Sequence, residues 1–80
     1  MDVHWSAPVR IELAPGQYRI ISSTLEAATF LLKEWPDGDE SIAVWARRVC
    51  QETFTGVRAA EDARSAFFLA CRNAGLRTMP

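Results

Sequence analysis

The chain has 80 residues, of which 49% are hydrophobic and 24% are charged, and its formal net charge at pH 7 is −1. So short a chain folds around one core and leaves little room for a large polar active site. The near-zero net charge excludes a general attraction to polyanions or anionic membranes, and the apolar fraction is typical of a folded protein. We expect a single domain over residues 1–80, with a net stability of roughly 4–12 kcal/mol.

The first predicted element is a β-hairpin. Val9, Ile11 and Leu13 alternate with charged residues, which is the period of a strand with one buried face. Residues 14–17 form a turn, because proline fixes φ at its first central position and glycine tolerates a positive φ at its second. We predict antiparallel strands over about residues 8–13 and 18–22. A lone hairpin is marginal in water, so its apolar face needs cover.

Three helices are predicted to provide that cover, over about residues 24–34, 40–55 and 58–74. A capping box starts the first helix, with the Ser23 hydroxyl accepting from a helical amide and Glu26 reaching back. Pro36 ends this helix, because the residue before proline avoids helical geometry. Asp39 or Ser41 is expected to cap the second helix. Glycines close the second and third helices, at Gly56 and Gly75.

The spacing of apolar residues assigns a buried face to each helix. In the first helix the predicted face comprises Leu25, Ala28, Leu31, Leu32 and Trp35, with Ala27 at its edge. In the second its centre comprises Ile42, Trp45, Ala46, Val49 and Thr53, and one flank comprises Ala43, Cys50 and Phe54. In the third it is built mainly of alanine, with Ala59, Ala60, Ala63, Ala66, Phe67, Ala70, Cys71 and Ala74. The predicted fold class is therefore α+β: an N-terminal antiparallel hairpin packed on three α-helices. Residues 76–79 form either a short third strand or a loop.

The order of several residue groups resembles one bacterial family. The groups are Trp5-x-x-Pro8-Val9-x-Ile11, Ala27-Ala28 with Leu31-Leu32-x-x-Trp35-Pro36, Ala46 through Cys50 to Gly56, Ala63-Arg64-x-Ala66-Phe67, and Ala74-Gly75-Leu76. Together they resemble the domain-of-unknown-function family 982, small proteins found largely in rhizobia-like alphaproteobacteria. The resemblance implies a fold and a cytoplasmic bacterial setting, and no catalytic activity. The sequence departs from the family pattern after Cys50. The resemblance therefore does not define the residue at which the second helix ends.

Residues that could carry chemistry are few and scattered. His4 is the only histidine, and with two separated cysteines it gives no zinc-binding spacing. The hydroxyls of residues 22–24 are explained by helix capping. The acidic turn at residues 37–40 contains only a fragment of a calcium-binding loop. We predict no catalytic, metal or cofactor site, and no enzymatic activity.

Cys50 and Cys71 are predicted to be buried, unreactive thiols. On antiparallel helices they are offset by roughly 10–12 Å along the axes, whereas a disulfide needs Cα atoms within about 7 Å. Free thiols are typical of a reducing compartment. No segment has the length of a transmembrane helix, and residues 1–6 lack the features of a signal peptide. We therefore expect a cytoplasmic protein without membrane association.

Four apolar residues outside the predicted buried faces form a candidate interaction surface: Phe30, Val44, Phe68 and Leu69. Single exposed hydrophobic residues are common. Four in so small a domain indicate either helices buried on two sides or a self-association surface. We expect a non-catalytic protein-interaction or regulatory domain. Its partner would be a second copy, bound through the first and third helices, or an unidentified protein.

Two alternative functions stay open. The arginines of the C-terminal half provide candidate anion contacts at Arg47, Arg48, Arg72 and Arg77, which would suit a nucleic-acid-associated regulator. The sequence pI of about 5.7 and the absence of a reader motif disfavour this role. A small-molecule-binding domain would instead need a pocket, for which the candidates are Trp5, Tyr18, Trp35 and Trp45. An aromatic core explains the same residues. Arg64 is expected to pack its stem and to pair with an acid from the first half of the chain.

Overall fold

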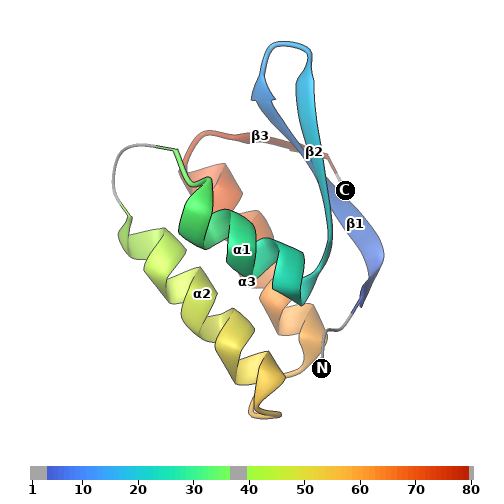
Figure 1. Ribbon diagram of the computed structural model, residues 1–80, viewed down its shortest axis with the longest axis vertical. Coiled ribbons are helices and arrows are strands. Elements are labelled where there is room, and N and C mark those ends of the chain that lie inside the picture. The colour runs from blue at the N-terminus through green and yellow to red at the C-terminus, as the bar shows by residue number, and fades with distance from the viewer. Residues whose placement is uncertain (1–3, 37–39, 80) are drawn as a thin grey trace.

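A computed structural model describes residues 4–36 and 40–79. In chain order the elements are β1 (His4–Ala14), β2 (Gln17–Ser23), α1 (Thr24–Lys33), α2 (Ser41–Phe54), α3 (Ala60–Asn73) and β3 (Arg77–Met79). The strands form one sheet, α1 and α3 lie against it, and α2 packs against both helices on the side away from the sheet (Figure 1). This architecture confirms the predicted α+β class, and residues 77–79 form the third strand. Within the described ranges, no helix is long and apolar enough to cross a membrane.

The sheet is antiparallel with the strand order β2-β1-β3. Val9 lies opposite Ile21 and Ile11 opposite Arg19, so the inward face of β1 follows the predicted alternation. Val9 and Ile11 are fully buried. Leu13 is more exposed than predicted, because the turn end of the hairpin projects past the helices (Figure 1).

β1 begins at His4, four residues before its predicted start. Its pairing with β2 is irregular between His4 and Val9, a stretch that contains Pro8. Proline cannot donate to a sheet and is tolerated at such irregularities. In this stretch Trp5 turns into the core, and its Nε1–H donates to Oγ1 of Thr24 at 3.1 Å. The alternation that predicted the strand breaks at Pro8, which is why the sequence did not indicate the earlier start.

The predicted cap of α1 is confirmed, with one difference. The Ser23 hydroxyl accepts from the Glu26 N–H at 3.1 Å. The Glu26 carboxylate reaches back one residue further than a capping box requires, and accepts from the Ser22 N–H at 3.0 Å. The predicted cap of α2 by Ser41 is wrong, because Ser41 is the first residue of the helix. Asp39 lies outside the described residues.

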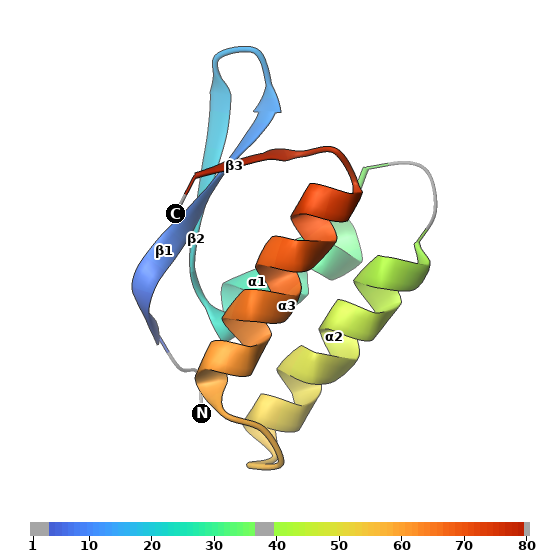
Figure 2. The same cartoon turned by 180° about the vertical axis from the view of Figure 1, so that it is seen from behind.

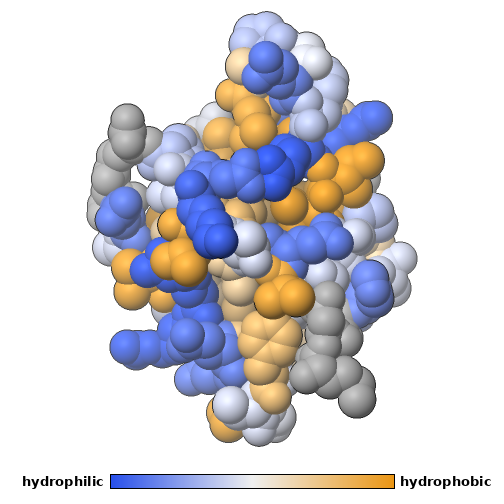
Figure 3. All heavy atoms as spheres, viewed as in Figure 1, coloured by the Kyte–Doolittle hydropathy of each residue, from blue (hydrophilic) through white to orange (hydrophobic). Residues whose placement is uncertain are grey.

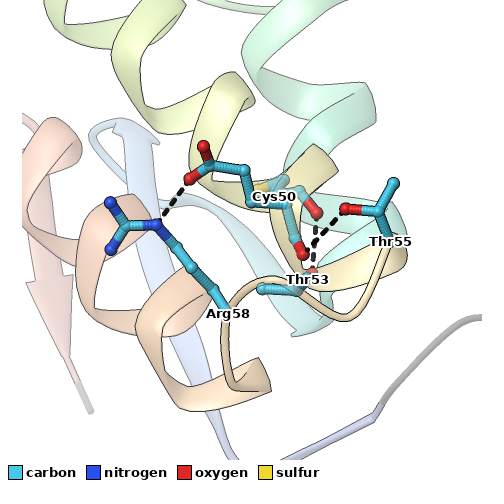
Figure 4. Close-up of polar contacts among 5 residues, drawn as sticks. Cys50, Thr53, Thr55 and Arg58 are labelled. Atoms are coloured by element: carbon cyan, nitrogen blue, oxygen red, sulfur yellow. Dashed lines mark hydrogen bonds and ion pairs between the residues drawn. The ribbon is translucent and has the colours of Figure 1, made fainter.

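The end of α2 is a well-defined turn around Gly56. Gly56 has a φ of +82°, and the next residue, Val57, donates its N–H to the Glu52 carbonyl at 2.8 Å. This is the Schellman pattern that satisfies the last helical carbonyls. Three side-chain hydrogen bonds surround the turn (Figure 4): Thr53 Oγ1 to the Cys50 carbonyl at 2.7 Å, Thr55 Oγ1 to the Glu52 carbonyl at 3.2 Å, and Arg58 Nε to Glu52 Oε1 at 2.5 Å. Residue 58 belongs to this turn, so α3 begins at Ala60, two residues later than predicted.

The predicted buried face of α1 is correct for Leu31, and Ala28 and Trp35 pack against the core, but it is wrong for Leu25 and Leu32. Phe30, placed on the surface by the sequence analysis, is only 1% exposed, whereas Leu25 and Leu32 are 52% and 63% exposed. The buried residues of this helix are Thr24, Ala27, Phe30 and Leu31. Phe30 can face the core because the two acids that flank it on the helical wheel are both bound by other groups of the protein. Glu26 caps the chain at Ser22, and Glu34 forms an ion pair with Arg19, whose guanidinium lies 5.8 Å from the Phe30 ring centroid.

Phe30 and Phe67 are the largest fully buried side chains. Their ring centroids lie 5.9 Å apart in an edge-to-face arrangement, and the Trp5 ring centroid also lies 5.9 Å from that of Phe67. The predicted centre of the α3 face is confirmed, with Ala63, Ala66, Phe67, Ala70 and Cys71 buried. The buried face of α2 comprises Ala43, Ala46, Val49 and Cys50, so Trp45 is displaced from its predicted centre and is 39% exposed.

Candidate functional site

Six of the described residues, along the solvent side of α3, line a shallow, open groove of about 820 Å3, which we call the α3 groove. They are Arg64, Ser65, Phe68, Leu69, Arg72 and Asn73. These residues repeat at intervals of four, so they form one stripe along the helix. α3 lies toward the viewer in Figure 2, on the side of the molecule opposite to α1.

Apolar and positively charged groups meet in the α3 groove. Leu69 is 48% exposed, and the half-buried Phe68 packs on the core at its base. The Arg72 guanidinium lies 5.9 Å from the Phe68 ring centroid, which is within cation–π range. Arg64 Nε donates to the Ala7 carbonyl at 2.7 Å. Among the described residues, Arg64 therefore pairs with backbone of the first half of the chain, and this contact holds its charge beside the groove.

A second, smaller groove of about 210 Å3 continues the α3 groove toward α2. It shares Ser65 and Leu69 with the α3 groove and adds Trp45, Val49, Arg58, Asp62 and Ala66. Trp45 thereby presents an exposed aromatic edge beside Leu69. Sequence reasoning placed Trp45 on the buried face of this helix and among the small-molecule pocket candidates, and did not assign it to this surface, because apolar residues cover more than half the circumference of α2 and allow several choices of buried face. The charge of Arg58 is already paired with Glu52.

The candidate interaction surface predicted from the sequence is only partly assembled. Phe68 and Leu69 lie together in the α3 groove. Val44 is 46% exposed on α2 but lines neither groove. Phe30 is in the core and was wrongly included.

The four candidate anion contacts are dispersed over three elements. Arg72 lines the α3 groove. Arg47 is half-buried, and its Nη1 donates to the Leu31 carbonyl at 3.3 Å. Arg77 Nη1 lies 3.6 Å from Oε1 of Glu12. Arg48 is exposed on α2. Neither groove includes Arg47, Arg48 or Arg77. Their role in anion binding stays a prediction.

The aromatic residues considered for a small-molecule pocket are also separated. Trp5 is buried against Phe67, and Trp35 packs edge-on against Phe30 at 6.2 Å. Tyr18 is half-exposed beneath the Arg10 guanidinium, 5.2 Å from its ring centroid. Trp45 lines the smaller groove. Their positions do not support a shared pocket.

Other chemically interesting residues are accounted for by the fold. His4 is exposed at the start of β1. The described residues contain no cluster of three histidine, cysteine or acidic side chains that could hold a metal ion. Most of the acidic turn at residues 37–40 lies outside the described residues.

Cys50 and Cys71 are free and buried, as predicted. Burial raises the pKa of the Cys50 thiol from its ordinary value of 9.0 to about 11, and that of Cys71 to about 12, because the core does not solvate a thiolate. Both thiols behave as small apolar groups at neutral pH.

We expect neither thiol to react with a thiol-specific reagent at about pH 8 while the chain is folded, because the reactive species is the thiolate. Both should react once denaturant unfolds the chain. Unfolded thiols ionise near pH 9, whereas the folded state keeps these protons up to about pH 11–12. Stability should therefore fall as the pH rises through this window. Rapid modification of the folded chain would contradict this account.

These features define the class: a small α+β domain with a three-stranded antiparallel sheet, three helices and an open apolar groove with arginines beside it. The model of the family described as "Protein of unknown function (DUF982)" matches residues 7–78. The chain belongs to this family, which confirms the resemblance. The chain is also similar to the NMR structure of Agrobacterium tumefaciens protein Atu1219, at 40% identity and a TM-score of 0.74, covering 91% of this chain and 73% of that one. No curated protein matches the chain.

Proposed function

We propose that this chain is a small, non-catalytic, cytoplasmic protein-interaction domain that binds a partner protein through the α3 groove. The observation that carries the proposal is the clustering of Phe68, Leu69 and Trp45 at the surface, next to Arg64 and Arg72. Exposed aromatic and arginine side chains around an apolar centre are typical of protein-binding hot spots.

The charge beside the groove indicates the chemistry of the partner. Arg64 and Arg72 both line the groove, and neither has an acidic partner among the described ion pairs. Apolar side chains would fill the groove over Leu69, and carboxylates would pair with the two guanidinium groups. The matching partner is therefore an amphipathic segment with acidic residues beside its apolar anchors.

Two further observations fit this role. The described residues that line the groove are arginine, serine, asparagine and apolar residues, a set that lacks a general base and an activated nucleophile. The buried free thiols suit a reducing compartment such as the cytoplasm. Both support a binding role over a catalytic one.

The test is capture of partners by the tagged chain from its native lysate, with and without nuclease, followed by mass spectrometry. We expect a protein partner in stoichiometric amount that survives nuclease and is lost when Leu69→Glu alters the groove. Nucleoid or ribosomal proteins that disappear with nuclease would instead support the nucleic-acid alternative, because that binding is carried by phosphate contacts. Capture that is independent of the groove would contradict the proposal.

A further inference from the structure

β2 forms one edge of the sheet, and part of its backbone is directed outward. The Ser22 N–H donates to Oε1 of Glu26 at 3.0 Å, so this N–H points away from β1. Alternate residues of an antiparallel strand direct their N–H and C=O groups to the same side. Tyr18 and Ile20 therefore also direct their backbone groups to the outer edge. Such an edge is a template for pairing with another strand.

The outer edge of β2 opens into a groove of about 350 Å3 whose other wall is α1. Arg19, Ile20 and Ile21 line it from the strand, and Leu25, Glu26 and Thr29 line it from the helix. Exposed apolar side chains flank this edge on both sides of the sheet, with Leu25 and Leu32 on the α1 side and Tyr18 and Ile20 on the side away from the helices. We call the surface formed by these four residues around the edge the α1–β2 face. α1 and β2 both lie toward the viewer in Figure 1, and apolar residues occur in several groups on that side of the molecule (Figure 3).

We propose that the α1–β2 face is a homodimer interface. The segment from Tyr18 to Ile20 pairs antiparallel with the same segment of a second copy, which joins two three-stranded sheets into one of six strands. The outward leucines of α1, Leu25 and Leu32, pack alongside this junction. The contact is isologous, with the same surface contributed by both copies, as in most dimers.

The composition of the face identifies the occupant as a second copy. An extended peptide could pair with β2, but it would leave Leu32 uncovered, because Leu32 lies seven residues beyond Leu25, or about 10 Å further along α1. A second copy brings both an edge strand and a helix with outward leucines. A stable interface also buries about 800 Å2 per partner, which the edge of one short strand does not supply alone.

Charge also favours self-association at this face. Arg19 forms an ion pair with Glu34, and the hydrogen bond that Arg19 donates lowers the pKa of the Glu34 carboxyl. The Glu26 carboxylate accepts from the Ser22 N–H. With Lys33, β2, α1 and its C-cap carry two positive and two negative groups. Pairing with the same segment of a second copy places the two Arg19 residues opposite each other, and the ion pair of each with its own Glu34 offsets their repulsion. Two copies meeting at the α3 groove would instead bring together Arg64 and Arg72 from both.

This geometry replaces the interface expected from the sequence. Dimerisation through α1 was predicted on the basis of Phe30, which is buried, whereas Leu25 and Leu32 are the residues that α1 presents to solvent. α3 lies on the opposite side of the molecule (Figure 2). A dimer formed through the α1–β2 face thus leaves both α3 grooves open.

The test is sedimentation velocity at micromolar and millimolar concentrations, compared with the mass of 9.0 kDa for one chain. We expect the unaltered chain to approach twice this mass. The double variant Ile20→Lys with Leu25→Glu should raise the dissociation constant at least about tenfold, because it places charges at the centre of the contact. The control variant Leu69→Glu, on α3, should sediment as the unaltered chain does.

Amide hydrogen exchange provides a readout that does not depend on a variant folding correctly. In the unaltered chain, the amides of Tyr18 and Ile20 should become more protected as the concentration rises, because their N–H groups then bond to the second copy. A chain that remains monomeric at millimolar concentration would overturn the proposal. So would a dimer abolished by Leu69→Glu but not by the double variant, or protection of these two amides that is independent of concentration.

Discussion

Phe30→Ala is expected to lower the free energy of unfolding by about 3–5 kcal/mol, out of a total of roughly 4–12 kcal/mol for a chain of this length. The Phe30 ring is buried and packs in edge-to-face arrangements with Phe67 and Trp35. The Arg19 guanidinium lies 5.8 Å from its ring centroid. Alanine would leave a cavity among these groups, because rigid rings and helix backbones cannot close over it. Urea unfolding followed by circular dichroism measures the loss.

Leu32→Ala is the matched control for Phe30→Ala, since it removes a large apolar side chain from the same helix. Leu32 is 63% exposed, so its replacement should change the stability of the monomer by less than about 0.5 kcal/mol. Both variants are measured at concentrations low enough to keep the chain monomeric. Equal losses from the two variants, or a larger loss from Leu32→Ala, would mean that α1 buries the face first predicted from its sequence.

Thr24→Val is expected to lower the free energy of unfolding by about 1–3 kcal/mol. Valine has nearly the shape of threonine but removes the oxygen that accepts from Trp5 Nε1–H at 3.1 Å. Thr24 is fully buried and Trp5 nearly so, and no buried side-chain nitrogen or oxygen of the described residues lacks a hydrogen-bond partner. The variant would create the first such group, an indole N–H without an acceptor.

Thr29→Val is the control for Thr24→Val. Its hydroxyl is exposed and donates to the Leu25 carbonyl within α1, so its loss should change the stability by less than about 0.5 kcal/mol. A double-mutant cycle with Trp5→Phe isolates the interaction free energy between Trp5 and Thr24, which should amount to about 1 kcal/mol. A cycle with no coupling, or equal effects of the two valine substitutions, would show that the indole contributes only by packing.

The elements of the fold could be predicted because local patterns determine them. The alternation around Val9 and Ile11, the cap at Ser23 and the glycines at positions 56 and 75 each depend on neighbouring residues only. The rotation of α1 could not be predicted in this way. Apolar residues occur on several sides of this helix, and the choice between Phe30 and Leu32 depends on contacts with Arg19 and Phe67, which are distant in the sequence.

The candidate site was predictable to a similar extent. Phe68 and Leu69 were identified because they fall off the alanine-rich stripe of α3, whose phase is unambiguous. The addition of Trp45 depends on how α2 is rotated against α3. The fixed position of Arg64 depends on a hydrogen bond to Ala7, 57 residues earlier in the chain. Spacing within one helix carries no information about either contact.

The two proposed surfaces lie on opposite sides of the molecule and imply a combined function. A dimer through the α1–β2 face would present two α3 grooves, and two linked sites can bind a bivalent target more tightly than one. The proposals are nevertheless separable, because Leu69→Glu alters only the groove and Ile20→Lys with Leu25→Glu alters only the dimer face.

The most direct test of the central claim, that the α3 groove binds a partner protein, compares Leu69→Glu with Val44→Glu in nuclease-treated pull-downs. The two side chains are 48% and 46% exposed, and both substitutions place a carboxylate on a helix surface, but only Leu69 lines the groove. The account predicts that Leu69→Glu loses the captured partner and that Val44→Glu retains it. Retention of the partner by Leu69→Glu, or equal loss from both variants, would contradict the claim.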